Sequence, residues 1–426
     1  MRSKKPFSAG KSTFVIFIAL LLGSVVPTQA QAQTFKVLHT FHGAPTDGAN
    51  PENPKLVLDK AGNIYGTTQL GGSREGVCAT FAGCGTVFKL DSTGKEVWLH
   101  RFTFAEGMQP LAGLTRDVSG NLYGTTELGG NAKCYRYGCG TVFELDKTGK
   151  KEKVLHKFAG STDGLFPEPT LARDSAGNLY GTTYAAIGNI FKIDTAGKLT
   201  VLYTFTGGAD GCYPVSGVIL DAAGNLYGVA AQGGIAFCDS GYGTVFEFDT
   251  AGKFTVLHTF DVTDGAYPGP VVFDSAGNLY GVTAAGGNNF TCGSTGCGTV
   301  FELSHQGSGW TESVLYSFCS LEDCADGESP GGAIVRDSAG DIYGTAGGGT
   351  ERNCNGDGCG VVFKLDASGT ESVLHNFSGR SDGSEPTGLT ADRFGNLFGT
   401  TFFGGDGHCS TGGGNYGCGV VFKVTP

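Results

Sequence analysis

The cysteines are the residues of this chain whose chemistry is easiest to constrain. Two neighbouring thiols can be oxidised to a disulfide, or two such pairs can supply the four thiolates of a zinc site. Each near pair in this sequence stands alone and no histidine recurs beside it, so we expect disulfides and an oxidising compartment rather than zinc. The fourteen cysteines form seven expected pairs: Cys78 with Cys84, Cys134 with Cys139, Cys212 with Cys238, Cys292 with Cys297, Cys319 with Cys324, Cys354 with Cys359, and Cys409 with Cys418.

Carboxylates recur in a second pattern, in which an acidic residue is followed by Gly and, three residues after that Gly, by Pro. A ring of such groups could bind calcium through oxygen ligands, with Asp47, Asp163 and Asp264 as the candidates. Asp-Gly also forms tight turns through the Asp side chain, and Pro stiffens the chain that follows. Because the pattern is present in every repeat, we favour the turn and expect no cofactor.

Specific recognition in a repetitive chain needs residues that differ between the repeats. Tyrosine and arginine are common recognition residues, and Tyr135, Arg136 and Tyr137 lie between two paired cysteines that would hold them in a short bridge. Other variable loops contribute charged or titratable residues that also differ between the repeats. The predicted ligand-binding residues are Tyr135, Arg136, Tyr137, Arg352, Asp406 and His408.

The sequence carries no local signature of catalysis. There is no nucleophile elbow with a Ser-His-Asp order, no phosphate-binding P-loop and no His-x-x-x-His metal pair. We therefore predict a monomeric, non-enzymatic binding or scaffold protein that recognises a protein or a glycan. The alternative is a secreted glycan-active hydrolase or lyase, because the two carboxylates of such an enzyme can come from distant segments and leave no motif.

Three short motifs recur seven times and define the elements that carry these residues. The first begins at Asn63 as NIYGTT, the second at Gly85 as GTVFKLD, and the third at Val37 as VLHTF. Together with the apolar segment before each NLYGTT motif, they predict four antiparallel strands per repeat, separated by turns rich in Asp and Gly. Histidine or tyrosine occupies one position of the fourth strand in all seven repeats, which indicates a packing role.

The order of strands at the two ends predicts a closed ring. The repeats begin with a fourth strand at residues 37–41 and end with a third strand at residues 419–424, so these two strands complete one unit only if they meet. We therefore predict an all-β fold, a seven-bladed β-propeller over residues 33–426, whose last blade is closed by the N-terminal strand. The variable loops and all cysteines then lie on one face, where we expect function.

The repeat also resembles a known family. The pattern D-x-x-G-N-L-Y-G-T-T, a Gly-rich loop and G-T-V-F-K-L-D-x-x-G is similar to the Gloeo/Verruco (GloVer) tandem repeat, found in exported bacterial proteins of undefined activity. The resemblance covers essentially all of residues 33–426. It implies a propeller-like fold and an export route, but it implies no chemistry.

The first 32 residues have the features of a secretory signal peptide. Basic residues precede an apolar run at residues 14–26, and small residues end at Ala32, the expected cleavage site. Cleavage removes four positive charges and leaves a net charge of −15 from the −11 of the whole chain. An acidic chain without a later apolar span is expected neither to bind nucleic acid nor to insert in a membrane. We expect a periplasmic or extracellular protein.

Overall fold

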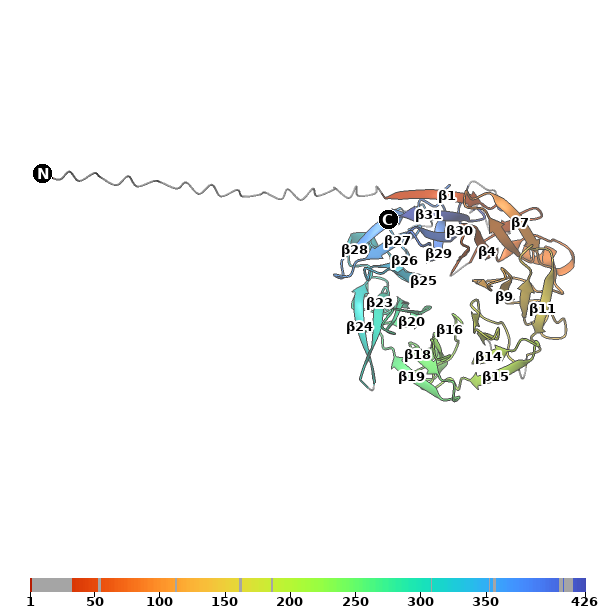
Figure 1. Ribbon diagram of the computed structural model, residues 1–426, viewed down its shortest axis with the longest axis horizontal. Coiled ribbons are helices and arrows are strands. Elements are labelled where there is room, and N and C mark those ends of the chain that lie inside the picture. Colours follow the sequence, from red (N-terminus) through yellow and green to blue (C-terminus); the bar gives the residue numbers. More distant parts are fainter. Residues whose placement is uncertain are drawn as a thin grey trace. The chain divides into compact units, whose positions relative to one another are not determined.

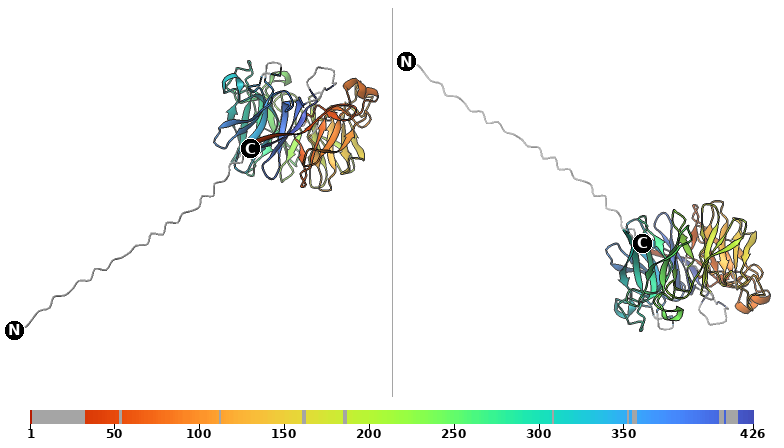
Figure 2. Two further views of the ribbon diagram at one scale, coloured as in Figure 1. Left: turned by 90° about the horizontal axis from the view of Figure 1, so that it is seen from above. Right: turned by 90° about the horizontal axis from the view of Figure 1, so that it is seen from below.

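The computed structural model describes Met1 and residues 33–52, 55–111, 113–160, 163–184, 187–307, 309–351, 353–354, 358–405, 409 and 417–426. Residues Gln33–Pro426 form one compact unit, in which seven antiparallel sheets surround a central axis (Figure 1). Edge-on views show that the strands of the blades run between the two faces of the ring (Figure 2). The predicted seven-bladed β-propeller is confirmed.

Blades 1 to 4 each contain four strands in sequence order. Blade 1 comprises β3 (Val57–Leu58), β4 (Ile64–Thr68), β6 (Thr86–Leu90) and β7 (Glu96–Arg101), and blade 2 comprises β8 (Thr115–Arg116), β9 (Leu122–Thr126), β10 (Thr141–Leu145) and β11 (Glu152–Lys157). Blade 3 comprises β12 (Ala172–Arg173), β13 (Leu179–Thr183), β14 (Asn189–Ile193) and β15 (Leu199–Thr204), and blade 4 comprises β16 (Val218–Leu220), β17 (Leu226–Ala230), β18 (Thr244–Phe248) and β19 (Phe254–Thr259).

Blades 5 to 7 follow the same plan, except that the inner strand of blade 5 is split in two. Blade 5 comprises β20 (Ala266–Pro268) and β21 (Val272–Phe273), then β22 (Leu279–Ala285), β23 (Thr299–Gln306) and β24 (Gly309–Ser317). Blade 6 comprises β25 (Glu328–Arg336), β26 (Ile342–Gly347), β27 (Val361–Leu365) and β28 (Glu371–Asn376), and blade 7 comprises β29 (Ser384–Ala391), β30 (Leu397–Phe403), β31 (Val420–Thr425) and β1 (Thr34–Thr40). The loops add β2 (Gly48–Ala49), β5 (Leu70–Gly71) and three 3-10 helices, η1 (Gly76–Phe81), η2 (Cys238–Ser240) and η3 (Glu322–Cys324).

The middle strands of each blade form its core. Phe88 in β6 is completely buried, and its ring lies against Gly66 of the neighbouring strand β4. A Cβ at Gly66 would lie 2.5 Å from the tip of that ring, so only glycine leaves room for it. The same pair recurs in every blade, which explains the glycine and the phenylalanine of the two sequence motifs.

The ring closes as the strand order predicts. β1 pairs with β31 in antiparallel register from Thr34 opposite Thr425 to Thr40 opposite Val420, so the N-terminal strand is the outer strand of the last blade (Figure 1). The strand begins at Thr34, three residues before the expected start. Phe41, just after it, is completely buried among residues of blades 7 and 1.

One joint links each blade to the next. In the crossover, the residue before the recurring proline has a left-handed backbone, and its N–H donates to a carbonyl of the preceding blade over 2.7 to 3.0 Å. The proline packs on the glycine that follows this carbonyl, where a Cβ would lie 2.2 to 2.6 Å from the proline Cδ. The left-handed residues are Asn50, Gln109, Phe166, Tyr213, Tyr267, Ser329 and Glu385. Each joint thus carries the crossover toward the central axis in the same way.

Candidate functional site

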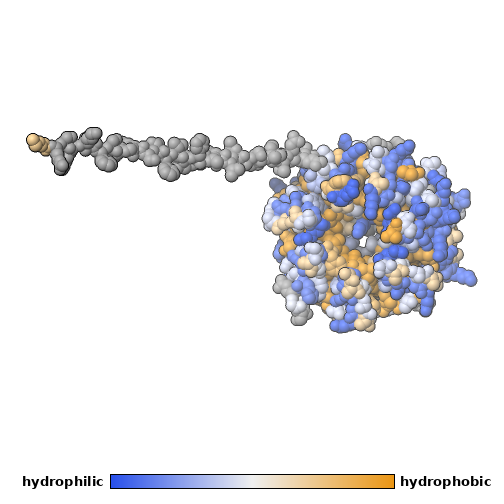
Figure 3. Space-filling model, viewed as in Figure 1, coloured by the Kyte–Doolittle hydropathy of each residue, from blue (hydrophilic) through white to orange (hydrophobic). Residues whose placement is uncertain are grey.

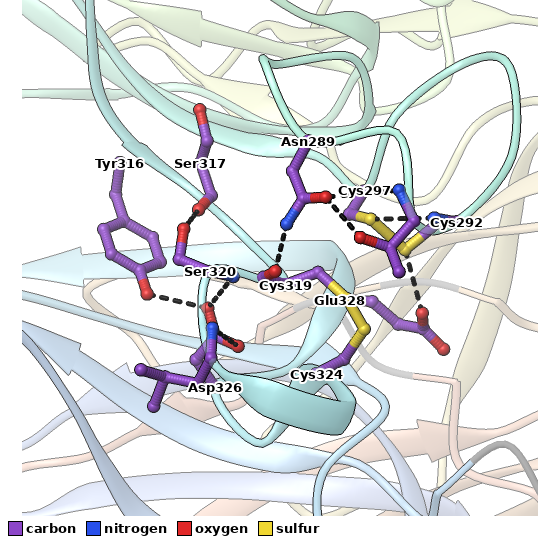
Figure 4. Close-up of a disulfide and its surroundings, with 12 residues drawn as sticks. Asn289, Cys292, Cys297, Tyr316, Ser317, Cys319, Ser320, Cys324, Asp326 and Glu328 are labelled. Atoms are coloured by element: carbon purple, nitrogen blue, oxygen red, sulfur yellow. Dashed lines mark hydrogen bonds between the residues drawn. A yellow bond between two sulfur atoms is a disulfide. The ribbon is translucent and has the colours of Figure 1, made fainter.

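All seven disulfides have the expected pairing, and they leave no free cysteine in the chain. Five of them contain the residue whose carbonyl accepts the hydrogen bond of the interblade joint, as Cys139 does from Phe166. In the blade 5 to blade 6 crossover, a second bond, Cys319–Cys324, lies beside Cys292–Cys297 (Figure 4). The disulfides therefore stiffen the loops on one face of the ring, which carries the crossovers and the loops between the second and third strands. We call it the variable face.

The residues of the predicted recognition cluster differ in exposure and in their contacts. Tyr135 is 68% exposed, whereas Tyr137 packs edge-on against Phe81 of blade 1 with ring centroids 4.8 Å apart. The Arg136 guanidinium lies over the Tyr137 ring, 5.0 Å from its centroid. The other predicted binding residues, Arg352, Asp406 and His408, lie outside the described residues, so their role stays a prediction.

The calcium candidates make the contacts of turn residues. Asp163 accepts hydrogen bonds from the N–H groups of Ala159 and Gly160, and its carboxylate lies 2.9 Å from His156 Nε2. Asp47 and Asp264 likewise accept backbone N–H groups and lie 3.8 Å and 3.0 Å from a histidine. Calcium prefers six to eight oxygen ligands, so imidazole nitrogens make these poor calcium sites. A calcium ion at these turns stays a prediction.

In five blades the recurring histidine or tyrosine of the fourth strand lies within hydrogen-bond distance of the turn carboxylate. In blade 5, the Tyr316 hydroxyl donates to Asp326 over 2.7 Å, and the Ser320 N–H donates to the same carboxylate over 2.8 Å (Figure 4). Tyr203 makes the same bond to Asp210 over 2.8 Å. Tyrosine can replace histidine here because either side chain can reach the turn carboxylate.

A glutamate of the next blade lies against several of these pairs. Burial raises the pKa of Glu152, Glu312 and Glu371 to about 7, and a carboxylate of the preceding blade adds to the effect at each position. One carboxyl oxygen of each has no hydrogen-bond partner among the described residues. In place of a glutamate, Phe254 stacks on Tyr203 with ring centroids 4.1 Å apart. These contacts between a fourth strand and the turn of the preceding crossover, which we call the outer rim, are a repeated packing contact.

A concavity lies at the centre of the ring, around which hydrophobic residues gather (Figure 3). Its volume is about 440 Å³. The residue that follows the joint proline lines it in every blade: Glu52, Leu111, Glu168, Val215, Gly269, Gly331 and Thr387. These seven positions are equivalent in the ring but carry different side chains. The pocket that they line is therefore asymmetric, and we call it the central pocket.

One side of the central pocket is acidic. Glu168 reaches the cavity and is otherwise enclosed by protein, and burial raises its pKa to about 8 with help from the carboxyl groups of Glu127 and Glu52. Glu52 is open to solvent at the mouth yet surrounded by protein on several sides, and burial, Glu127 and Glu385 raise its pKa to about 7. Burial also raises the pKa values of Glu127 and Glu385. These four glutamates belong to blades 7, 1, 2 and 3, and we call them the acidic arc.

The other side is apolar, and the floor carries a lysine. Blades 4 to 6 contribute residues such as Val215, Tyr267 and Pro268. A smaller cavity of about 60 Å³ adjoins the pocket through Ser216 and Pro270, and Lys55 lines it. Burial lowers the pKa of Lys55. The pocket therefore has carboxyl groups on one side and apolar side chains on the other, and the Lys55 amine lines the smaller cavity beside it.

The sequence reasoning missed this site. The acids are far apart in the chain. Glu52 and Glu168 meet at the central pocket because each follows a joint proline at the axis of the ring. A signal was present: the residue after that proline is Glu in two repeats and Leu, Val, Gly, Gly or Thr in the others.

A family model places the chain among known repeat proteins. The Gloeobacter/Verrucomicrobia repeat matches residues 21–187, 135–353 and 239–426 in overlapping segments. The chain belongs to this family. The suspected GloVer relationship is therefore confirmed, and the family accounts for the repeat but assigns no chemistry to the pocket. No curated protein matches the chain.

Solved structures similar to this family member are diverse propeller proteins. Virginiamycin B lyase from Staphylococcus aureus, crystallised as an inactive form with quinupristin, has 13% identity and a TM-score of 0.57, with 92% of this chain and 99% of that chain covered. Extracellular domains of a hybrid two-component system and of a one-component system from B. thetaiotaomicron each have 13% identity and a TM-score of 0.54; this chain covers 41% of each. At such identities the likeness shows the fold alone.

Proposed function

We propose that this chain is an exported, non-enzymatic binding protein that holds part of a protein or glycan ligand in the central pocket of its disulfide-braced face. Seven disulfides suit an extracellular or periplasmic location, where they persist. In the part of the chain that the structure describes, no helix is long and apolar enough to cross a membrane.

The observation that carries this proposal is the divergence at the position after the joint proline. The joint itself is the same in all seven blades, as a structural element should be. The next residue varies from Glu168 to Gly331 and faces one cavity. A concave, largely apolar cavity of several hundred Å³ with a few polar groups is the usual form of a ligand site.

The proposal can be tested by filling the pocket. A Cβ at Gly331 would meet nothing within 4 Å, and the backbone there suits any residue, so Gly331→Trp places an indole in the cavity. Gly309, at the start of β24 and outside the pocket, has equally open surroundings, so Gly309→Trp is the matched control.

The readout is binding to a glycan array and to a peptide library. Wild type and Gly309→Trp should bind the same probes, whereas Gly331→Trp should lose them by at least ~10-fold, about 1.4 kcal/mol of binding free energy. Equal binding by Gly331→Trp would place the site elsewhere.

A glycan-active hydrolase or lyase is the second candidate, because Glu52 and Glu168 line one cavity with raised pKa values. Two carboxyl groups facing one substrate are what most glycosidases use. Incubation of the array glycans with wild type and Glu168→Gln separates the candidates. Product formed by wild type and lost in the variant would establish the enzyme, and binding without product supports the binding protein.

A further inference from the structure

The acidic arc has no basic partner among the described residues. None of its four glutamates takes part in an ion pair, and Glu168 makes no side-chain hydrogen bond, although it is enclosed by protein everywhere except at the cavity. An ionised carboxylate that is enclosed by protein is costly unless it meets a positive charge, and without one the group keeps its proton to a higher pH. No described cation of the protein pairs with the acidic arc. A cationic ligand can therefore supply the positive charge.

The acidic arc is not arranged to hold a metal ion through three carboxylates. Within the described residues, no three of these glutamates place carboxylate oxygens within 4.8 Å of one another, as a shared cation would require. The cavity of about 440 Å³ also exceeds the space a single ion needs. An organic cation can bridge the distance between the acidic arc and the apolar residues of blades 4 to 6.

We infer, on the basis of the proposed function, that the central pocket binds a lysine or arginine side chain of a peptide or protein partner. The charged end lies against Glu168 and Glu52, and the hydrocarbon stem lies against residues such as Val215 and Tyr267. Lysine and arginine combine an apolar stem with a charged tip, which matches the two sides of the pocket. An amino sugar carries the charge but is covered with hydroxyl groups and suits the apolar side poorly.

The net charge of the protein favours the same partner. The whole chain carries −11, which attracts a basic segment over long range and repels an acidic one. Lys55 lies below the pocket, where it would accept an anionic group such as a peptide carboxyl end. The geometry thus suits a basic residue near the end of a chain or in an exposed loop.

Binding of a cation here should depend on pH. Glu168, with a pKa of about 8, and Glu52, with a pKa of about 7, are mostly protonated at pH 6 and mostly ionised at pH 9. The neighbouring titratable groups are Glu127, Glu385 and, in the adjoining smaller cavity, Lys55. A lysine side chain keeps its charge over this range. Affinity should therefore rise by at least ~10-fold from pH 6 to pH 8.5 as protons leave the arc.

The experiment titrates the disulfide-bonded exported chain with acetyl-Ala-Leu-Lys-Leu-Ala-amide by ligand-observed NMR or calorimetry. The same peptide with norleucine in place of lysine keeps the stem and removes the charge. A tetramer of glucosamine whose amines are trimethylated, and therefore charged at every pH, supplies the charge without the stem. The lysine peptide should bind at least ~10-fold more tightly than either.

Variants then assign the effect to the arc. Glu52→Gln/Glu168→Gln should remove the preference for lysine and the pH dependence. Glu312→Gln should change neither, because Glu312 also has a raised pKa but lies on the outer rim, outside the pocket.

Three results would overturn the inference: no binding of the lysine peptide, equal binding of the norleucine peptide, or tighter binding of the glucosamine tetramer. The pocket-filling variant separates this failure from that of the proposed function. If Gly331→Trp removes binding of an uncharged peptide, the pocket is a ligand site and only the inference fails. If Gly331→Trp leaves the binding of every probe unchanged, both fail.

Discussion

The backbone N–H of Asn50 donates a hydrogen bond to the carbonyl oxygen of Cys418 over 2.8 Å, which joins the first crossover of the chain to its last loop. The joint between blades 7 and 1 is therefore the same as the joints between consecutive blades. Pro51 packs on Gly419, as the other joint prolines pack on theirs. The ring is closed by a repeat of its own interblade contact, in addition to the pairing of β1 with β31.

Removal of the N-terminal strand should destabilise the whole ring. Deletion of residues 33–42 exposes the edge of β31 and removes Phe41, which is completely buried. Loss of one buried phenylalanine side chain alone costs ~3 to 5 kcal/mol. The expected result is a clearly lower melting temperature, with Phe41→Ala showing a smaller decrease. A truncated protein that melts at the wild-type temperature would contradict closure by this strand.

The closing joint can be tested with a pair of matched glycines. Gly419 and Gly252 both have φ of +87°, but a Cβ at Gly419 would lie 2.3 Å from the Thr401 carbonyl oxygen, whereas one at Gly252 meets nothing within 4 Å. Both alanine variants carry the same backbone strain of ~1 kcal/mol. Gly419→Ala should therefore lower the free energy of unfolding more than Gly252→Ala in chemical denaturation. Equal losses of unfolding free energy would mean that a Cβ at Gly419 is accommodated, so that the joint is less closely packed than the structure shows.

The sequence was sufficient for the blades but not for the pocket. Repeated pairs such as Gly66 with Phe88 leave motifs at fixed spacing, so strand order and closure could be predicted. Glu168 and Lys55 acquire their surroundings from crossovers of other blades, and no local pattern records that convergence. The cluster around Tyr135 could be selected from the sequence because it differs between the repeats. Burial at the axis depends on all seven blades and can be seen only in the folded ring.

The outer rim predicts a pH dependence of stability. The folded-state pKa of Glu312 is raised from 4.5 to about 7, so the folded protein binds the extra proton between those values and loses stability as the pH rises through them. Glu312→Gln removes this loss. At pH 8 the variant should be more stable by ~1 kcal/mol, a value that allows for solvent screening at a half-buried site, and near pH 4.5 the gain should disappear.

Thermal melts at the two pH values measure the effect, with Glu75→Gln in an exposed loop as the control. A gain for Glu312→Gln that is the same at both pH values would show that its cause is packing and not ionisation.

Loss of a disulfide should weaken the ring modestly. Cys134→Ser/Cys139→Ser opens a short loop, and the chain-entropy account gives ~2 kcal/mol for a loop of that length. The melting temperature should fall while the circular dichroism spectrum stays that of a β-protein. Peptide mapping of the exported wild type without reductant should give the seven pairs, and free thiols or bound zinc at stoichiometric levels would refute them.

The most direct test of the account is to compare the two candidate sites on one probe. Binding of the tightest peptide or glycan from the library screen is measured for wild type, Gly331→Trp and the triple variant Tyr135→Ala/Arg136→Ala/Tyr137→Ala. If the central pocket is the site, Gly331→Trp loses at least ~10-fold in affinity and the triple variant stays within ~2-fold of wild type. Loss of affinity in the triple variant, with full affinity in Gly331→Trp, would contradict the account and return the site to the loop between Cys134 and Cys139.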